Sequence, residues 1–275
     1  MEPRDWYKQP CLLGVDEAGR GPVIGPMVYG VAFAPISEKE NLKKKAFADS
    51  KTLTSERRDK LYDQIEKDDM IGFNADEISA SFISGGMLGC QKVSLNAMAN
   101  ESTYKLIRSV LDAGVNLQEV YVDTVGDAGI YQQKLSREFP GIQFTVCPKA
   151  DALYPIVSAA SIVAKVKRDR AIANNEGLTD VGSGYPGDPA TKAWLEANIN
   201  NTFGYSNDVR FSWSTCVTLM EKNCIKVDWE ADDDSPGGQP SLAAMMSGGG
   251  SGGKKMKPRH SYFRARKLQK VIAGW

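Results

Sequence analysis

Short apolar runs separated by turn-forming residues occur in the first 80 residues and predict strands. Residues 11–15 (CLLGV) and 27–34 (MVYGVAFA) flank the glycine-rich segment AGRGPVIGP, which is typical of two strands joined as in a hairpin. Residues 70–78 (MIGFNADEI) resemble a third strand. The chain therefore begins with a strand-rich region.

Apolar residues at helical spacing occupy two segments of the same half. Residues 55–67 follow Thr54, and their apolar positions Leu61 and Ile65 lie four apart, which predicts a helix. A longer helix is expected from about residue 92 to residue 113, ending at a glycine. Its apolar stripe comprises Leu95, Met98, Leu106, Val110 and Leu111.

Strand and helix patterns then alternate. EVYVD at 119–123 and IQFTV at 142–146 predict strands, and the segments 128–138 and 155–174 predict helices. This rhythm is characteristic of an α/β fold, in which crossover helices cover a largely parallel part of a sheet.

The pattern changes after residue 180 and again after residue 227. DPATKAWLEANI and SWSTCVTLMEKN predict two helices with no strand between them, and from residue 228 the sequence becomes acidic, then rich in glycine and serine, then basic. We therefore expect an α/β domain at 1–180, a small helical part at 181–227 and a flexible tail at 228–275.

Composition limits the class of protein. With 275 residues and 42% apolar content, the chain has ample material for a buried core. Its five cysteines include no C-x-x-C pair, which favours a reducing compartment over a disulfide framework. No apolar run approaches the roughly 18 residues that span a bilayer, so we expect a soluble intracellular protein without membrane association.

Charge is distributed unevenly along the chain. The formal net charge is zero, but residues 254–275 contain eight of the 34 basic residues and no acid. This basic arm suits a polyanionic partner or a nuclear import signal, although most charged runs are solvated surface.

Histidine is nearly absent, since the single one is His260 in the basic arm. Serine or cysteine nucleophile systems and zinc hydrolase sites require histidine near the reacting atoms. Carboxylates must therefore supply any acid–base or metal chemistry, and oxygen-only ligand sets suit Mg²⁺ and Mn²⁺.

Four acids stand where such a site is expected. Asp16 and Glu17 directly follow the first apolar run, Asp123 ends the run YVD, and Asp151 precedes a helical segment. These segments can converge at the carboxyl edge of one sheet. Four clustered carboxylates repel one another unless divalent cations neutralise them, which favours a site for two metal ions.

Each acid also has a structural interpretation. Asp151 could cap the helix that follows, and Asp123 could form a turn that begins at Thr124. Adjacent acids at Asp16 and Glu17 serve packing poorly. The segment GVDEAGRG also approximates a phosphate-binding loop, but Arg20 and Gly21 replace its lysine and hydroxyl residue.

Long motifs resemble type 2 ribonuclease H. They are GVDEAGRGPVIGPMVYG, DSKTL, VDTVG, KADALYPIVSAASIVAK, GSGYPGDPATKAWL and VRFSW, which together span roughly residues 10–225. FGYSNDVRFSW and the residues around ADALYP are most similar to the large catalytic chain of the eukaryotic enzymes, which is the A component of a heterotrimer. The tail after residue 228 has no clear counterpart.

The resemblance implies a ribonuclease H-like fold, a five-stranded mixed sheet flanked by helices, with a helical C-terminal part that completes a nucleic-acid cleft. The family's metal ligands correspond to Asp16, Glu17, Asp123 and Asp151, the acids already singled out, and all four are intact. Two smaller accessory subunits and a nuclear location are also expected from the resemblance.

The resemblance further implies substrate contacts. The family senses ribose with the backbone of a G-R-G turn and with a tyrosine after S-G-Y-P. The corresponding residues are Gly19, Arg20, Gly21 and Tyr185. Without the resemblance, Tyr185 could equally be a surface aromatic braced by a proline.

By the same analogy, Ser50, Lys51 and Asn96 would lie along the duplex backbone. A serine–lysine pair before a helix suits a phosphate contact, but it is also common where helices begin.

The implied activity is metal-dependent cleavage of RNA in RNA/DNA hybrids and of ribonucleotide-containing duplex DNA. Two other classes of protein stay open at this point. One is a nucleoside triphosphatase that uses the imperfect phosphate loop. The other is a non-catalytic subunit that only binds nucleic acid.

Overall fold

A computed structural model describes residues 3–45, 47, 54–124 and 126–226. Ser50 and Lys51, the predicted tail at 228–275 and His260 lie outside the described residues. Residues through Lys226 belong to one compact unit. The predicted division of that unit after residue 180 stays a prediction.

A five-stranded mixed sheet organises this unit, as predicted. Its strands are β1 (Cys11–Ala18), β2 (Met27–Pro35), β3 (Gly72–Ile78), β4 (Leu117–Asp123) and β5 (Gln143–Cys147). They lie in the order β3-β2-β1-β4-β5. The β1–β2 and β2–β3 pairs are antiparallel, whereas β1–β4 and β4–β5 are parallel.

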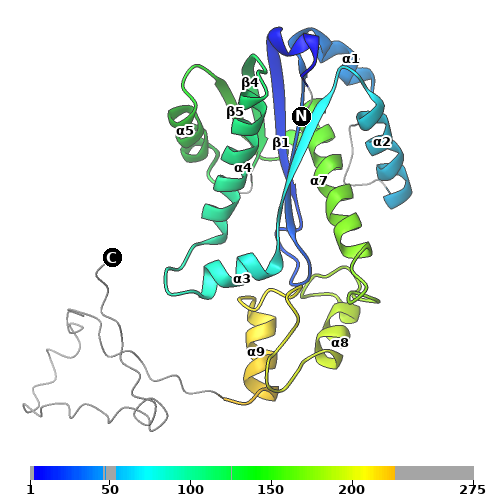
Figure 1. The fold of residues 1–275 in the computed structure, drawn as a ribbon, viewed down its shortest axis with the longest axis vertical. Helices are drawn as coiled ribbons and strands as arrows, with labels where there is room; N and C mark the ends of the chain where they lie inside the picture. The colour runs from blue at the N-terminus through cyan, green and yellow to red at the C-terminus, as the bar shows by residue number, and fades with distance from the viewer. Residues whose placement is uncertain (1–2, 46, 48–53, 125, 227–275) are drawn as a thin grey trace, which may run out of the picture. The chain divides into compact units, whose positions relative to one another are not determined.

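Helices cover both faces of the sheet (Figure 1). On one face, α4 (Leu95–Asp112) and α5 (Ala128–Glu138) pack against alternate strand residues such as Leu13 and Val15. On the other, α2 (Ser55–Lys67) and α7 (Pro155–Ala173) share a core with Leu12. Because both faces are covered, β2 is buried at all nine positions and shows no polar alternation.

Several helix boundaries follow from local chemistry. The Thr54 and Ser94 hydroxyls accept hydrogen bonds from the backbone N–H groups of Arg57 and Ala97, so α2 and α4 begin at the next residues. The expected start of the second helix near residue 92 is therefore three residues early. Gly114 has a φ of 85°, consistent with the predicted stop.

The sequence patterns missed the short elements. These are α1 (Lys39–Lys44), α3 (Ala80–Leu88), α6 (Ala150–Leu153), and the 3₁₀ turns η1 (Asp5–Lys8) and η2 (Ile36–Glu38). Most are too short for an apolar period to be visible. Helix α6 matters most for function because it contains Asp151.

The helical part lies at the carboxyl end of β1 (Figure 1). It contains α8 (Pro189–Ala197) and α9 (Ser214–Asn223), which correspond to the two predicted helices. These elements have their own apolar cluster, which includes Val23 and Ile24 from the loop between β1 and β2. The cluster therefore joins the helical part to the loop that follows the G-R-G turn. Among the described residues, no helix is long and apolar enough to cross a membrane.

Candidate active site

The ends of parallel strands bring the predicted acids together. Val15 of β1 pairs with Val122 of β4, so Asp16 and Asp123 are the next residues on neighbouring parallel strands. Because β5 is also parallel to β4, the segment that follows β5 leads Asp151 to the same edge. The strand pairing places Asp16 beside Asp123, and the charges of Asp123 and Asp151 both act on Asp16, so the three segments converge at this edge.

Asp16 is a buried carboxylate with few compensating partners. Only 5% of the residue is exposed, and its Oδ1 accepts a hydrogen bond of 2.8 Å from the Glu17 N–H group. The pKa of Asp16 is raised to about 6, mainly by burial and also by the charges of Asp123 and Asp151, while hydrogen bonds from Ser161 and the Glu17 N–H group act to lower it. The negative charge on Asp16 is therefore unfavourable unless a cation is nearby.

Asp123 connects the end of β4 to α6. Its Oδ1 accepts a hydrogen bond of 3.0 Å from the Ala150 N–H group, the residue before Asp151. Thr124, not Asp123, makes the local turn contact, since its hydroxyl accepts a bond of 3.2 Å from the Gly126 N–H group. The alternative of Asp123 as a simple turn former is not supported.

Asp151 lies within α6 and is 5% exposed. The residue that caps α7 is Tyr154, followed by Pro155 as the first helical residue, so the helix-capping interpretation of Asp151 is wrong. The Ser158 hydroxyl donates a hydrogen bond to the Asp151 carbonyl oxygen. Lys149, which precedes α6, adopts a left-handed conformation with φ of 58°.

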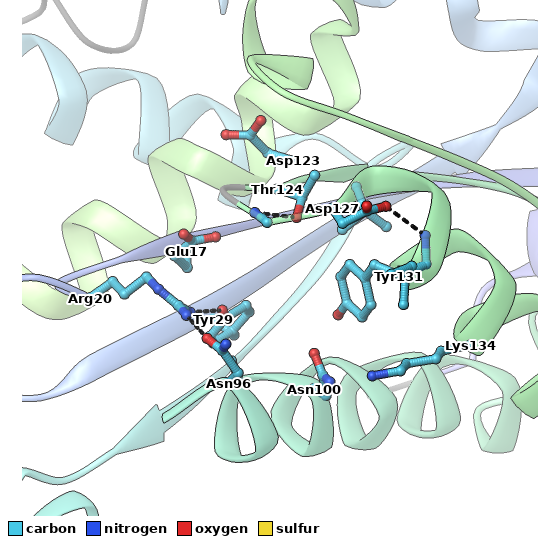
Figure 2. Close-up of a pocket in the computed structure, with 14 residues that line it drawn as sticks. Glu17, Arg20, Tyr29, Asn96, Asn100, Asp123, Thr124, Asp127, Tyr131 and Lys134 are labelled. Atoms are coloured by element: carbon cyan, nitrogen blue, oxygen red, sulfur yellow. Dashed lines mark hydrogen bonds between the residues drawn. The ribbon is translucent and has the colours of Figure 1, made fainter. Parts of the chain in front are cut away.

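Glu17 and Asp123 border a pocket of about 180 Å³. Figure 2 shows these acids on one side of it, with Asn96, Asn100 and Lys134 from α4 and α5 on the other. Sequence reasoning found Asn96 by resemblance but missed Asn100, Tyr131 and Lys134, for which no motif gave a signal. Burial raises the pKa of Tyr131 to about 12, so its phenol stays protonated at neutral pH.

The carboxylate set suits hard divalent cations by its chemistry. Oxygen donors are the preferred ligands of Mg²⁺ and Mn²⁺, and a cation would relieve the unfavourable charge on buried Asp16. Within the described ranges, no three His, Cys, Asp or Glu side chains are gathered closely enough to hold one ion. The oxygen donor atoms therefore fit a divalent metal ion by their chemistry, but the described side chains are not arranged closely enough to coordinate one.

The G-R-G turn lies beside the predicted tyrosine. A Cβ atom at Gly21 would stand 3.1 Å from Cε1 of Tyr185, and Tyr185 is 49% exposed. Gly19 has a φ of 77°, and a Cβ atom there would be 2.6 Å from the Pro26 carbonyl oxygen. The structure therefore brings together two segments separated by more than half of the chain.

Arg20 reaches from this turn to α4. Its Nη1 donates a hydrogen bond of 3.3 Å to the Tyr29 hydroxyl, and its Nη2 donates to Oδ1 of Asn96 (Figure 2). The turn leads into β2, not into a helix. A phosphate-binding loop requires a following helix, so the phosphate-loop alternative is not supported.

Arg210 and Trp213 contact the G-R-G turn, which the sequence did not reveal. Both belong to the VRFSW motif, which resembled the family without indicating a role. Arg210 is fully buried and donates hydrogen bonds to the Gly19, Arg20 and Gly25 carbonyl oxygens, while Trp213 donates to that of Gly21. No local pattern distinguishes a buried arginine of this kind from an exposed one.

Comparisons with known proteins agree with this architecture. The family model described as Ribonuclease HII matches residues 13–216. The chain is 46% identical to the A subunit of ribonuclease H2 from Arabidopsis thaliana, over 97% of this chain and 96% of that protein. It is 45% identical to the A subunit of ribonuclease H2 from Homo sapiens, over 97% of this chain and 91% of that protein.

Solved structures show the same fold. Ribonuclease H2 from Pyrococcus horikoshii superposes with a TM-score of 0.68 at 33% identity, covering 77% of this chain and 98% of that one. Ribonuclease HII of Archaeoglobus fulgidus, solved in complex with PCNA, gives a TM-score of 0.66 at 31% identity, covering 76% and 96%. The family match and the relatives together show that this chain belongs to the ribonuclease HII family and is a ribonuclease H enzyme.

Proposed function

We propose that this ribonuclease H hydrolyses the RNA strand of RNA/DNA hybrids and cuts on the 5′ side of single ribonucleotides in duplex DNA. The observation that carries the proposal is the convergence of Asp16, Asp123 and Asp151 at one sheet edge, with the G-R-G turn and Tyr185 adjoining. Acids able to hold metal ions thus lie near groups able to recognise a sugar.

Asp16, Glu17, Asp123 and Asp151 are the proposed catalytic carboxylates and the proposed holders of two Mg²⁺ or Mn²⁺ ions. When bound, such ions supply Lewis-acid activation of water and neutralise charge on the departing oxygen. The rigid strand ends keep Asp16 and Asp123 in place, and the Ala150 N–H group orients the Asp123 carboxylate. The expected products carry a 3′-hydroxyl and a 5′-phosphate.

Substrate selection is assigned to the turn and the tyrosine. The 2′-hydroxyl is the group that tells RNA from DNA, and glycine at positions 19 and 21 allows the backbone to approach a sugar closely. Tyr185, exposed beside Gly21, would lie against the deoxyribose on the 3′ side of the ribonucleotide. Asn96, which accepts a hydrogen bond from Arg20, would lie along the duplex backbone, as would Ser50 and Lys51.

The relatives' names extend the proposal to an assembly. Since each of these proteins is named as one lettered subunit of ribonuclease H2, we infer that this chain works with other subunits, two smaller ones by the family resemblance. A nuclear location and a role in replication and ribonucleotide removal are part of the same proposal. The basic residues at 254–275 support nuclear import or partner binding.

Cleavage of one defined duplex tests the proposal. The full chain, with and without two accessory subunits, would be incubated in Mg²⁺ or Mn²⁺ with a DNA duplex that carries one ribonucleotide. The all-DNA duplex and an RNA/DNA hybrid serve as controls, and end mapping locates the cut. We expect cutting 5′ of the ribonucleotide and within the hybrid only. ATP turnover without nucleic acid, or hybrid binding without cleavage under all conditions, would contradict it.

A further inference from the structure

The backbone of the G-R-G turn is held by the C-terminal helical part. Arg210 donates from Nη2 to the Gly19 carbonyl oxygen at 2.5 Å and from Nη1 to that of Arg20 at 3.0 Å. Trp213 donates from Nε1 to the Gly21 carbonyl oxygen at 3.0 Å. All three carbonyl groups of the turn therefore accept hydrogen bonds from side chains nearly 200 positions later in the chain.

Arg210 is an unusual choice for a purely structural contact. It is fully buried, its Nε donates to the Gly25 carbonyl oxygen at 3.1 Å, and it has no ion-pair partner among the described residues. Burial, together with the nearby charge of Arg168, lowers the pKa of Arg210 to about 9. A buried cation without a carboxylate destabilises a fold. The planar fork of guanidinium, which matches several carbonyl groups at once, indicates a geometric requirement.

That requirement follows from peptide geometry. In a trans peptide the N–H group points opposite to the C=O group, and the described residues contain no cis bond. Because the Gly19 and Arg20 carbonyl groups face Arg210, the N–H groups of Arg20 and Gly21 face away from it. Neither N–H group donates a hydrogen bond to another described residue. The peptide after Gly21 has no N–H group, because Pro22 follows.

We propose that Arg210 is a positioning residue that directs the Arg20 and Gly21 N–H groups toward the ribose 2′-hydroxyl, an inference that rests on the proposed function. Arg168 supports the same arrangement, since its Cδ would be 2.5 Å from a Cβ atom at Gly19. Tyr185 confines the turn at Gly21. The helical part thereby sets the selectivity of a site whose carboxylates lie at the ends of β1 and β4 and in α6.

Binding preference in a cleavage-deficient protein tests this role. In the full chain carrying Asp123→Asn, with its accessory subunits, affinity would be measured for a DNA duplex with one ribonucleotide and for the same all-DNA duplex. Arg210→Lys keeps the charge but loses the fork, and should lower the ribonucleotide preference about tenfold with all-DNA affinity changed less than about twofold. Arg210→Gln, which removes the buried charge, should lower the preference by about threefold or more.

Trp213→Phe is the matched control. It removes the hydrogen bond to the Gly21 carbonyl oxygen, whose peptide has no N–H group, and keeps an aromatic ring at the position where Arg210 Cζ lies 4.9 Å from the Trp213 ring centroid. Its preference should change less than about threefold. Thermal unfolding of each variant identifies which ones are folded.

The outcomes separate the two proposals. If either folded Arg210 variant keeps the wild-type preference, or loses affinity for both duplexes equally, Arg210 is not a positioning residue for ribose recognition. If the Asp123→Asn protein with intact Arg210 shows no preference for the ribonucleotide, the proposed substrate is wrong. The inference about Arg210 is then also wrong, and the measurement on the protein with intact Arg210 identifies the cause.

Discussion

The carboxylate edge and the G-R-G turn are neighbours that depend on different parts of the molecule. Asp16 and Asp123 are placed by strand pairing within the sheet, and a backbone hydrogen bond links Asp123 to α6. The turn is placed by side chains from the helical part. Under the proposed function, the catalytic carboxylates are therefore placed by strand ends and α6, whereas recognition depends on the contact between sheet and helical part.

Burial acts on opposite charges in the two regions. It raises the pKa of Asp16 to about 6 at the carboxylate edge and lowers the pKa of Arg210 to about 9 behind the turn. Each region thus keeps a charge that destabilises the fold. The two buried charges are compensated in different ways. Added cations can neutralise the carboxylates, whereas the guanidinium donates hydrogen bonds to carbonyl groups that are already present.

The largest expected effect is on cleavage at the carboxylate edge. Asp16→Asn or Asp123→Asn should reduce cleavage of every substrate roughly a thousandfold or more, since each removes a charged ligand from the proposed metal site. Steady-state rates on a hybrid and on a single-ribonucleotide duplex measure it. Glu101→Gln, a change at an exposed acid of α4, is the matched control. Near-normal turnover by either aspartate variant at saturating Mg²⁺ would refute the assignment.

The second expected effect is on the stability of the metal-free protein. The folded pKa of Asp16 is raised above its ordinary value of 3.8, so ionisation destabilises the fold as pH rises from about 4 through about 6. Asp16→Asn should therefore be more stable than wild type at pH 7, by at most about 3 kcal/mol. The difference should vanish below about pH 4.

Urea unfolding in EDTA at several pH values measures this difference. Glu101→Gln again serves as the control and should give no pH-dependent gain. The opposite result would be a metal-free wild type that gains stability relative to Asp16→Asn between pH 4 and pH 7. It would show that the fold stabilises the ionised carboxylate, contrary to the prediction.

A smaller effect is expected at the recognition region. Tyr185→Ala should lower cleavage of a single-ribonucleotide duplex several-fold more than cleavage of a long hybrid, because the tyrosine is assigned to the deoxyribose beyond the junction. The ratio of the two rates is the measurement. Phe203→Ala, at a more exposed aromatic residue of the helical part, is the control. If Tyr185→Ala keeps the wild-type ratio, junction sensing by this tyrosine is wrong.

The smallest expected effect is on stability, at two residues with a left-handed backbone near the two regions. Lys149, before α6, and Asp180, before the S-G-Y-P segment, have φ values of 58° and 56°. Glycine relieves the left-handed conformation, so Lys149→Gly should stabilise the protein by about 0.5–1 kcal/mol. Asp180→Gly is the matched change. The denaturant unfolding midpoints of both variants measure the change in stability. A loss of stability in Lys149→Gly would show that the lysine side chain stabilises the protein by more than the backbone strain destabilises it.

The sheet and its acids could be predicted because their signals are local. Apolar runs marked every strand, and Asp16 with Glu17 directly followed one of them. Helix α3 could not be predicted, since Gly85 and Gly86 lie within it and lower its helix propensity. Asp151 was assigned to the right edge, but its alternative role as a helix cap ignored the separate helix α6.

The support of the G-R-G turn was unpredictable for a physical reason. The burial of Arg210 depends on where the helical part meets the sheet, and no property of VRFSW itself specifies the acceptors. The resemblance to the family identified the turn and Tyr185 as a pair. Only the fold showed that a third segment holds the turn's carbonyl groups.

The hydrogen bond between Arg210 and Gly19 joins residues 191 positions apart, and this has a consequence for chain synthesis. The ribosome completes the strands that carry Asp16 and Asp123 well before it adds the arginine that secures the turn. A chain interrupted after β5 would contain those acids without the side chains that hold the G-R-G turn. In the finished protein, local opening of the helical part would release the turn while the strand pairing persists. Under the proposed function, sugar selection would therefore be completed after the strands that carry Asp16 and Asp123, and local opening of the helical part would impair it.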